Sequence, residues 1–351
     1  MKLTRIEQEA LMREIQSYLT GNRIKDRNTL LLEWVHHQEA RDQLDDPESF
    51  FSELEELIDA YLPLQRKRFT KDMLENAELW VRYLFDRAQR LLTKEKYEDA
   101  LILLQLLESH LGPKAPDNPP NRHEFFSLDN YYQYYLLKEV LNYQHGVNLT
   151  QYDYSTLYYA LYFANLHLGR ADEAMMQLGI ANSWNPVSLP VLLAICEFFK
   201  DKRVPDRLLI VGKFAVNVAI YPDEIGDALR FVGFAYYLHG KHEKAYACYY
   251  QSLRFGGDTK GASSEINAIL LALGQDKTYQ LSRRELRDLF AGEDFFPDVS
   301  KNALRALKKT IVTKYEEEAF TEVIHYGEIY LALKPDPTVA KLVARAVEKL
   351  N

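Results

Sequence analysis

The stretch YYALYFANLHLGRADEAMMQLGIANSWNP, at residues 158–186, predicts two helices joined by a tight turn. Four residues recur at i, i+3, i+4 and i+7, the spacing of one helix face; they are Tyr158, Leu161, Tyr162 and Asn165. Gly169 ends the first helix at a turn. Pro186 ends the second, because a proline cannot continue a helix.

A second copy of the pattern begins 71 residues later and reads LRFVGFAYYLHGKHEKAYACYYQSLRFGG, at residues 229–257. Its first helix carries Leu229, Val232, Gly233 and Tyr236 on one face, and its turn is at Gly240. Ala174 and Ala245 occupy the same place on the second helix of each copy. We expect Gly233 and Ala245 to face each other where the helices cross. A repeated helix pair predicts a solenoid, in which each unit buries its apolar face against its neighbours.

Both copies resemble the tetratricopeptide repeat, with large and small residues paired on the first helix, a glycine turn, alanine on the second helix and a closing proline. Weaker copies lie at 88–108 and 307–335, and a degenerate one at 189–222. The corresponding markers are Ala100, Ala174, Gly212, Ala245 and Val323. The resemblance implies an all-α, right-handed superhelical solenoid of antiparallel helix pairs, with an N-terminal helical segment and a C-terminal capping helix.

Composition shifts along the chain predict five regions. An N-terminal helical segment occupies 1–62, degenerate repeat-like helices 63–111, a proline-rich linker 112–128, the central repeat array 129–289, and a C-terminal unit with its capping helix 290–351. The linker contains GPKAPDNPPNR, which holds too many prolines for a helix. The acidic stretch 39–59 is interpreted as a solvated face, or alternatively as a surface that folds back on the array through complementary charge, and the basic run 66–71 follows it.

The balance of charge and apolar residues excludes several functions. A net charge of −8 over 351 residues argues against a nucleic-acid partner, which would require a basic stripe. The N-terminus lacks the apolar run of a signal peptide, and no stretch reaches the roughly 18 apolar residues of a membrane span. We therefore expect a cytoplasmic protein with neither a nucleic-acid nor a membrane partner. Cys196 and Cys248 are interpreted as small buried apolar residues.

No sequence motif for catalysis or cofactor binding is present. The sequence contains no HExxH, GxSxG, phosphate-binding glycine loop or dinucleotide fingerprint. His239 and His242 flank a turn with the spacing of a metal-ligand pair, but a second pair is lacking. We expect a protein that is not an enzyme and has no cofactor and no metal.

The resemblance also implies a concave groove lined by the first helix of each pair. The stripes that would face it contain six residues: Tyr159, Phe163 and Leu166 in the first copy, and Arg230, Phe234 and Tyr237 in the second. An aromatic lining with one cation suits an amphipathic helix or an extended peptide. In the alternative interpretation, the N-terminal segment or the helix at 129–143 fills the groove.

These observations predict a non-enzymatic scaffold or adaptor that binds a protein or peptide in its groove. The alternative is a regulatory sensor that responds to a peptide through its N-terminal helices. A homodimer formed through exposed terminal helices is a further expectation, since solenoids often associate in this way. The sequence does not identify the partner.

Overall fold

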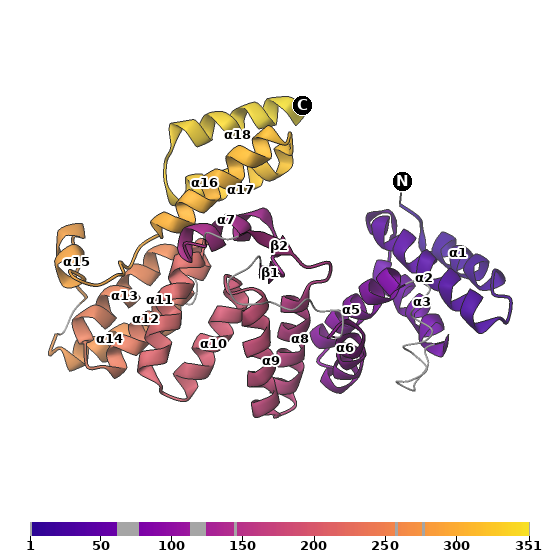
Figure 1. The fold of residues 1–351 in the computed structure, drawn as a ribbon, viewed down its shortest axis with the longest axis horizontal. Helices are drawn as coiled ribbons and strands as arrows, with labels where there is room; N and C mark the ends of the chain where they lie inside the picture. The colour runs from indigo at the N-terminus through magenta and orange to yellow at the C-terminus, as the bar shows by residue number, and fades with distance from the viewer. Residues whose placement is uncertain are drawn as a thin grey trace. The chain divides into compact units, whose positions relative to one another are not determined.

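The computed structural model of the chain describes residues 2–61, 77–112, 124–143, 146–256, 259–275 and 278–350 (Figure 1). Within these ranges it contains seventeen α-helices and two three-residue strands. The strands, β1 (Glu124–Phe126) and β2 (Val147–Leu149), pair in parallel with Phe125 opposite Asn148. The expected all-α class is thus confirmed, with this one short parallel pair that the sequence analysis did not predict.

The chain divides into two compact units. Unit 1 comprises Met1–Ala115 and Ala160–Met175, and unit 2 comprises Pro116–Tyr159 and Met176–Asn351. The boundaries fall inside α8 (Tyr154–His167) and α9 (Ala171–Trp184), so each of these helices has residues in both units.

Unit 1 is a small helical bundle around an aromatic core. Its remaining elements are α1 (Arg5–Ser17), α2 (Arg23–Glu39), the 3₁₀ helix η1 (Arg41–Gln43), α3 (Pro47–Tyr61), α5 (Ala77–Thr93) and α6 (Tyr97–Leu111). Trp34 is fully buried and meets Tyr83 edge to face, with ring centroids 5.3 Å apart. Edge-to-face pairs of this kind add to the apolar burial. The segment at 1–62 that was expected to be helical contains α1, α2 and α3 among its described residues.

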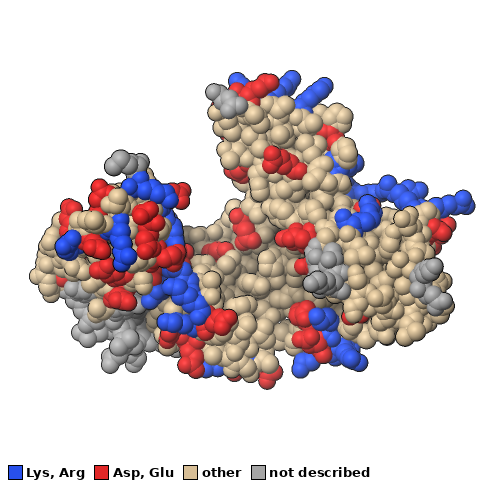
Figure 2. Space-filling model, turned by 180° about the vertical axis from the view of Figure 1, so that it is seen from behind, with Lys and Arg blue, Asp and Glu red and all other residues tan. Residues whose placement is uncertain are grey.

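Among the acidic residues of the stretch 39–59 whose side chains the structure describes, one is buried. Glu55 forms ion pairs with Arg87 and Arg90 of α5, which join α3 to that helix. Glu53 and Glu56 are exposed, as expected of a solvated face. Figure 2 shows acidic and basic side chains interspersed over the N-terminal helices. The basic run at 66–71 lies outside the described residues.

Unit 2 contains the longer series of helices. Besides parts of α8 and α9, these are α7 (Tyr131–Val140), α10 (Leu189–Asp201), α11 (Pro205–Val218), α12 (Pro222–Leu238), α13 (His242–Phe255), α14 (Thr259–Ala272), α15 (Arg283–Leu289), α16 (Lys301–Glu316), α17 (Phe320–Leu333) and α18 (Pro337–Leu350). Each helix from α10 to α13 packs against the next one along the chain, and so do α16 and α17. Among the described helices of both units, none is long and apolar enough to cross a lipid bilayer.

The faces that the sequence pattern selected are buried. In the first copy Leu161, Tyr162 and Asn165 lie in the interior, and in the second copy Leu229 and Tyr236 are fully buried. The small residues of the second helices are buried as well. Helical periodicity therefore identified the core faces of both predicted copies.

One turn geometry recurs along the chain. Six described residues end a helix in the left-handed conformation, and in each case the next N–H bonds to the carbonyl oxygen five residues earlier; they are Glu95, Gly169, Arg203, Gly240, Gly274 and Glu318. At Gly240, for example, Lys241 N donates to Tyr236 O over 2.9 Å. This bond satisfies a carbonyl that the helix end would leave unpaired. The four central turns lie 34, 37 and 34 residues apart.

In five of these turns the next helix begins at once. The residue after the left-handed one accepts the first helical hydrogen bond, donated by a residue that is fully buried; these donors are Ala100, Ala174, Leu208, Ala245 and Val323. Four of them are the markers found in the sequence. The fifth is a correction: the equivalent position in the degenerate copy is Leu208, one turn before Gly212. Its turn residue is Arg203, so no glycine marks the repeat there.

The helices at the two ends of unit 2 pack as follows. α7 lies against α16 and α11, where the Tyr132 hydroxyl donates to Val218 O over 3.0 Å. α18 packs on α17 at Gly327, where an added Cβ would clash with a methyl carbon of Val343. The basic residues Lys341, Arg345 and Lys349 of this last helix are exposed.

A carboxylate links three helices of unit 2 to the irregular segment after α15. Glu293 accepts hydrogen bonds from Lys213 of α11, Tyr236 of α12 and Lys244 of α13, the first over 2.7 Å. Burial alone would raise the pKa of Glu293, but these hydrogen bonds and the lysine charges outweigh it and lower the pKa to about 2. The segment is thereby fixed to the helix stack.

We predict that Gly240→Ala destabilises the protein by about 1 kcal/mol, because a side chain at this left-handed position is strained. Gly179→Ala is the matched control. Both glycines are exposed and have open space where an added Cβ would lie, but Gly179 has ordinary helical geometry. The control should be stabilised by about 0.5–1 kcal/mol. Thermal unfolding of the two variants measures the difference, and equal shifts would contradict the turn assignment.

We predict that Glu293→Gln destabilises the protein by about 1–3 kcal/mol at neutral pH, since two lysines lose a charged partner. The folded-state pKa of about 2 lies below the ordinary value of 4.5, so the carboxylate contributes fully above about pH 4.5. Its contribution is lost as the pH falls toward 2. Urea unfolding at several pH values should show the variant and the wild type converging across that window, with Asp294→Asn as the neighbouring control. A constant difference would contradict this explanation.

Candidate functional site

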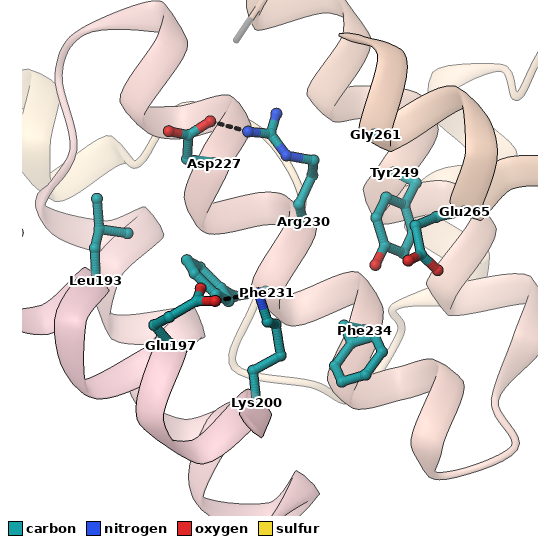
Figure 3. A pocket seen from close by; sticks show the side chains of 10 residues that line it. All are labelled: Leu193, Glu197, Lys200, Asp227, Arg230, Phe231, Phe234, Tyr249, Gly261 and Glu265. Atoms are coloured by element: carbon teal, nitrogen blue, oxygen red, sulfur yellow. Dashed lines mark hydrogen bonds and ion pairs between the residues drawn. The ribbon is translucent and has the colours of Figure 1, made fainter. Parts of the chain in front are cut away.

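A cleft of about 510 Å³ lies in unit 2 where α10, α12 and α14 approach one another (Figure 3). Its lining comes mostly from these three helices, with one tyrosine from α13: Leu193, Glu197, Lys200, Asp227, Arg230, Phe231, Phe234, Tyr249, Gly261 and Glu265. α10 and α12 are the first helices of consecutive turn-linked pairs, and α10 also contacts α12 directly. The cleft therefore follows from the order of the helix pairs.

The apolar part of the cleft rests on a small buried cluster. Cys196, Leu208 and Ala235 are fully buried, and Phe231 and Phe234 pack against them. Both phenylalanines are only half-buried, so each presents part of its ring to the cleft. Half-exposed aromatic rings on a rigid helix can gain apolar contact with a ligand at low conformational cost.

Tyr249 packs closely against a glycine on the facing helix. A Cβ at Gly233 would stand 2.7 Å from Cδ2 of the Tyr249 ring, closer than such atoms come in proteins. We expected Gly233 to face Ala245, but the nearest atoms to an added Cβ belong to Tyr249, one turn further along α13. Burial raises the pKa of Tyr249, and the negative charge of Glu265 adds to the effect.

The charged residues of the cleft form two pairs within single helices. Glu197 binds Lys200 on α10, and Asp227 binds Arg230 on α12, as the dashed lines in Figure 3 show. The Arg230 side chain is 17% exposed, and its Nη1 is buried with no hydrogen-bond partner among the described residues. Glu265 on α14 has no ion pair with any of the described residues. The described lining thus holds three carboxylates and two cations, and one guanidinium nitrogen has no partner among the described residues.

Of the six residues predicted to line a groove, two lie in the cleft. Arg230 and Phe234 line it together, as the second stripe requires. Tyr237, from the same stripe, is half-buried outside the cleft, with its ring centroid 5.4 Å from that of His242.

The stripe of the first copy is divided between the units. Tyr159 belongs to unit 2, where burial raises its pKa. Phe163 belongs to unit 1 and lies against Tyr97 of α6, with centroids 6.2 Å apart. Leu166, also in unit 1, is 45% exposed. The chain's own Tyr97 therefore covers part of this stripe, while a single surface made of both stripes stays a prediction.

In the alternative interpretation, another helix of the chain fills the groove. For the helix at 129–143, the structure tests this at the cleft. The helix expected at 129–143 is α7, which packs on α16 and α11 and contributes none of the described lining residues. Glu197, Lys200 and Glu265 were missed by sequence reasoning. Glu197 and Lys200 lie in the degenerate copy. Glu265 lies on α14, and no described helix begins directly after the turn that ends α14, so the sequence shows no helix pair there.

The other candidate reactive groups are not among the described residues that line the cleft. Cys196 and Cys248 are buried free thiols, as expected, and burial raises the pKa of Cys196 to about 12. His239 lies 3.3 Å from a carboxylate oxygen of Asp206. The described residues include no group of three or more histidine, cysteine or acidic side chains placed to hold a metal ion.

Comparison with protein-family models gives no match, and neither does comparison with curated proteins. The packing of neighbouring helices in pairs is compatible with a helical repeat. The tetratricopeptide assignment itself has no support from a family match, so inferences about function depend on the geometry of the cleft.

We predict that Gly233→Ala destabilises the protein by about 1–3 kcal/mol, because the Tyr249 ring must move away from the new methyl group. Tyr249→Leu removes the ring edge that would clash. The double variant should therefore be more stable than the sum of the two single effects predicts. Thermal unfolding of all three variants measures this coupling, and strictly additive effects would show that the two residues do not oppose each other.

Proposed function

We propose that the chain is a non-enzymatic scaffold that binds a peptide or a partner helix in the cleft between α10, α12 and α14. The observation that carries this proposal is the composition of the cleft. Phe231 and Phe234 offer half-exposed rings on rigid helices, and charged pairs surround them. Aromatic and arginine anchors of this kind commonly supply most of the binding energy of a protein interface.

The proposed architecture is a right-handed superhelical solenoid of the tetratricopeptide type. The recurrent left-handed turn supports it, since the central turns are 34, 37 and 34 residues apart and a tetratricopeptide unit has about 34 residues. A second observation also supports it. After five of the turns, the residue whose N–H makes the first hydrogen bond of the next helix is fully buried, so the equivalent position of each second helix packs in the interior. In such an array the first helices line the inner surface.

A second candidate function is a peptide-responsive regulatory sensor with N-terminal helices as its output. One observation favours it: the helices α1, α2, α3 and α5 have their own aromatic core in unit 1, while the cleft belongs to unit 2. Hydrogen exchange in residues 2–61 distinguishes the two functions. A change in exchange when a partner binds at the cleft supports the sensor, and unchanged exchange supports the scaffold.

We predict that Phe234→Ala weakens partner binding by about 2–4 kcal/mol, because it removes a central aromatic anchor. Phe214→Ala is the matched control, since Phe214 is a half-buried phenylalanine of the neighbouring helix α11 that does not line the cleft. The experiment is recovery of partners from native lysate with each variant, alongside its melting temperature. Loss of a partner with both variants, or with neither, would contradict the proposal.

A further inference from the structure

We infer that the peptide bound in this cleft carries a lysine or arginine next to a large apolar residue, with its cation at Glu265 and its apolar side chain on Phe231 and Phe234. This inference rests on the proposed function of the cleft and adds the chemistry of the partner.

The charge balance of the cleft is the first argument. Lys200 is already bound to Glu197, and Arg230 is already bound to Asp227. Glu265 is half-buried on α14 and has no ion pair among the described residues. Among the described lining residues, three carboxylates against two cations give a formal charge of −1, which a ligand cation would neutralise. A half-buried carboxylate interacts with such a cation more strongly than an exposed one, since water screens the pair less.

The position of Glu265 is the second argument. Figure 3 shows its carboxylate beside the Tyr249 ring, and its charge contributes to the raised pKa of that tyrosine. The Tyr249 ring lies close to the backbone of α12, since a Cβ added at Gly233 would stand 2.7 Å from its Cδ2. A cation at Glu265 would therefore meet a carboxylate and an aromatic ring together, and the face of such a ring attracts cations.

The unpaired nitrogen of Arg230 is the third argument. Its Nη1 is buried and lacks an acceptor among the described residues, while Nη2 binds Asp227. A backbone carbonyl oxygen of an extended peptide can accept from Nη1 without adding a charge. An acidic side chain there would stand close to Asp227, so the site favours a neutral acceptor at Arg230 and a cation at Glu265.

The experiment selects peptides on the purified full-length chain from a phage-displayed library of random nonapeptides. Three baits are used in parallel: the wild type, Glu265→Lys, and the control Glu328→Lys. Glu328 is an exposed residue of α17 outside the cleft. We expect the wild type and the control to enrich peptides with a basic residue beside a large apolar one. Glu265→Lys should enrich acidic residues at the same place, because the sign of the site is reversed.

A selected peptide then enters a double-mutant cycle measured by fluorescence anisotropy. Glu265→Gln should weaken binding about three- to tenfold, and replacing the basic residue of the peptide with methionine should weaken it by a similar factor. Together the two changes should cost little more than either alone, because both remove the same pair. The circular dichroism and melting temperature of Glu265→Gln should match the wild type, since the carboxylate has no ion pair among the described residues.

The outcomes separate the two claims. Peptides whose binding is lost with Phe234→Ala but which lack a basic residue would overturn the inference and leave the proposed function standing. Basic peptides whose affinity is unchanged by Glu265→Gln would also overturn the inference. Failure to select any peptide that depends on Phe234 would overturn the proposed function, and the inference with it.

Discussion

The organisation of unit 2 depends on the hydrogen bond that closes each left-handed turn. At Gly240 the bond from Lys241 N to Tyr236 O ends one helix, and Lys241 O begins the next. Because no spacer residue intervenes, the second helix must run back along the first, and its fourth residue, Ala245, is buried between them. The same turn and helix start occur at Arg203. Here an arginine adopts the left-handed conformation, at a cost of roughly 1–2 kcal/mol relative to glycine. Packing of the helix pairs must offset this strain.

The cleft is a consequence of the same constraint. When consecutive pairs turn back in the same way, their first helices lie side by side, and α10 contacts α12 in this manner. The space between them is lined by residues that adjoin the buried stripe, such as Phe231 and Phe234, which the core can cover only in part. Their partial exposure therefore arises from the stacking, and charged pairs within α10 and α12 also line this space. A separate contact holds the irregular segment after α15. Its Glu293 accepts hydrogen bonds from α11, α12 and α13 of the same unit.

The sequence allowed the buried faces to be predicted where the repeat pattern was intact. Leu229 and Tyr236 were found from their spacing alone, and Arg230 and Phe234 followed as the adjoining stripe. The pattern failed after Arg203, because the copy at 189–222 is degenerate and few of its residues match the repeat. This failure shifted the marker of the degenerate copy to Gly212 and hid the α10 side of the cleft. The partner of Gly233 was also missed, since periodicity gives the face of a helix but not which residue opposes it.

The central claim is that the cleft between α10, α12 and α14 is a protein-binding surface. Site-specific photo-crosslinking tests it most directly, with p-benzoylphenylalanine placed at position 234 in one sample and at position 214 in another. Both positions hold half-buried phenylalanines, but only Phe234 lines the cleft. The account predicts a discrete crosslinked adduct from position 234 and none from position 214. Adducts from position 214 alone, or equally from both positions, would contradict it.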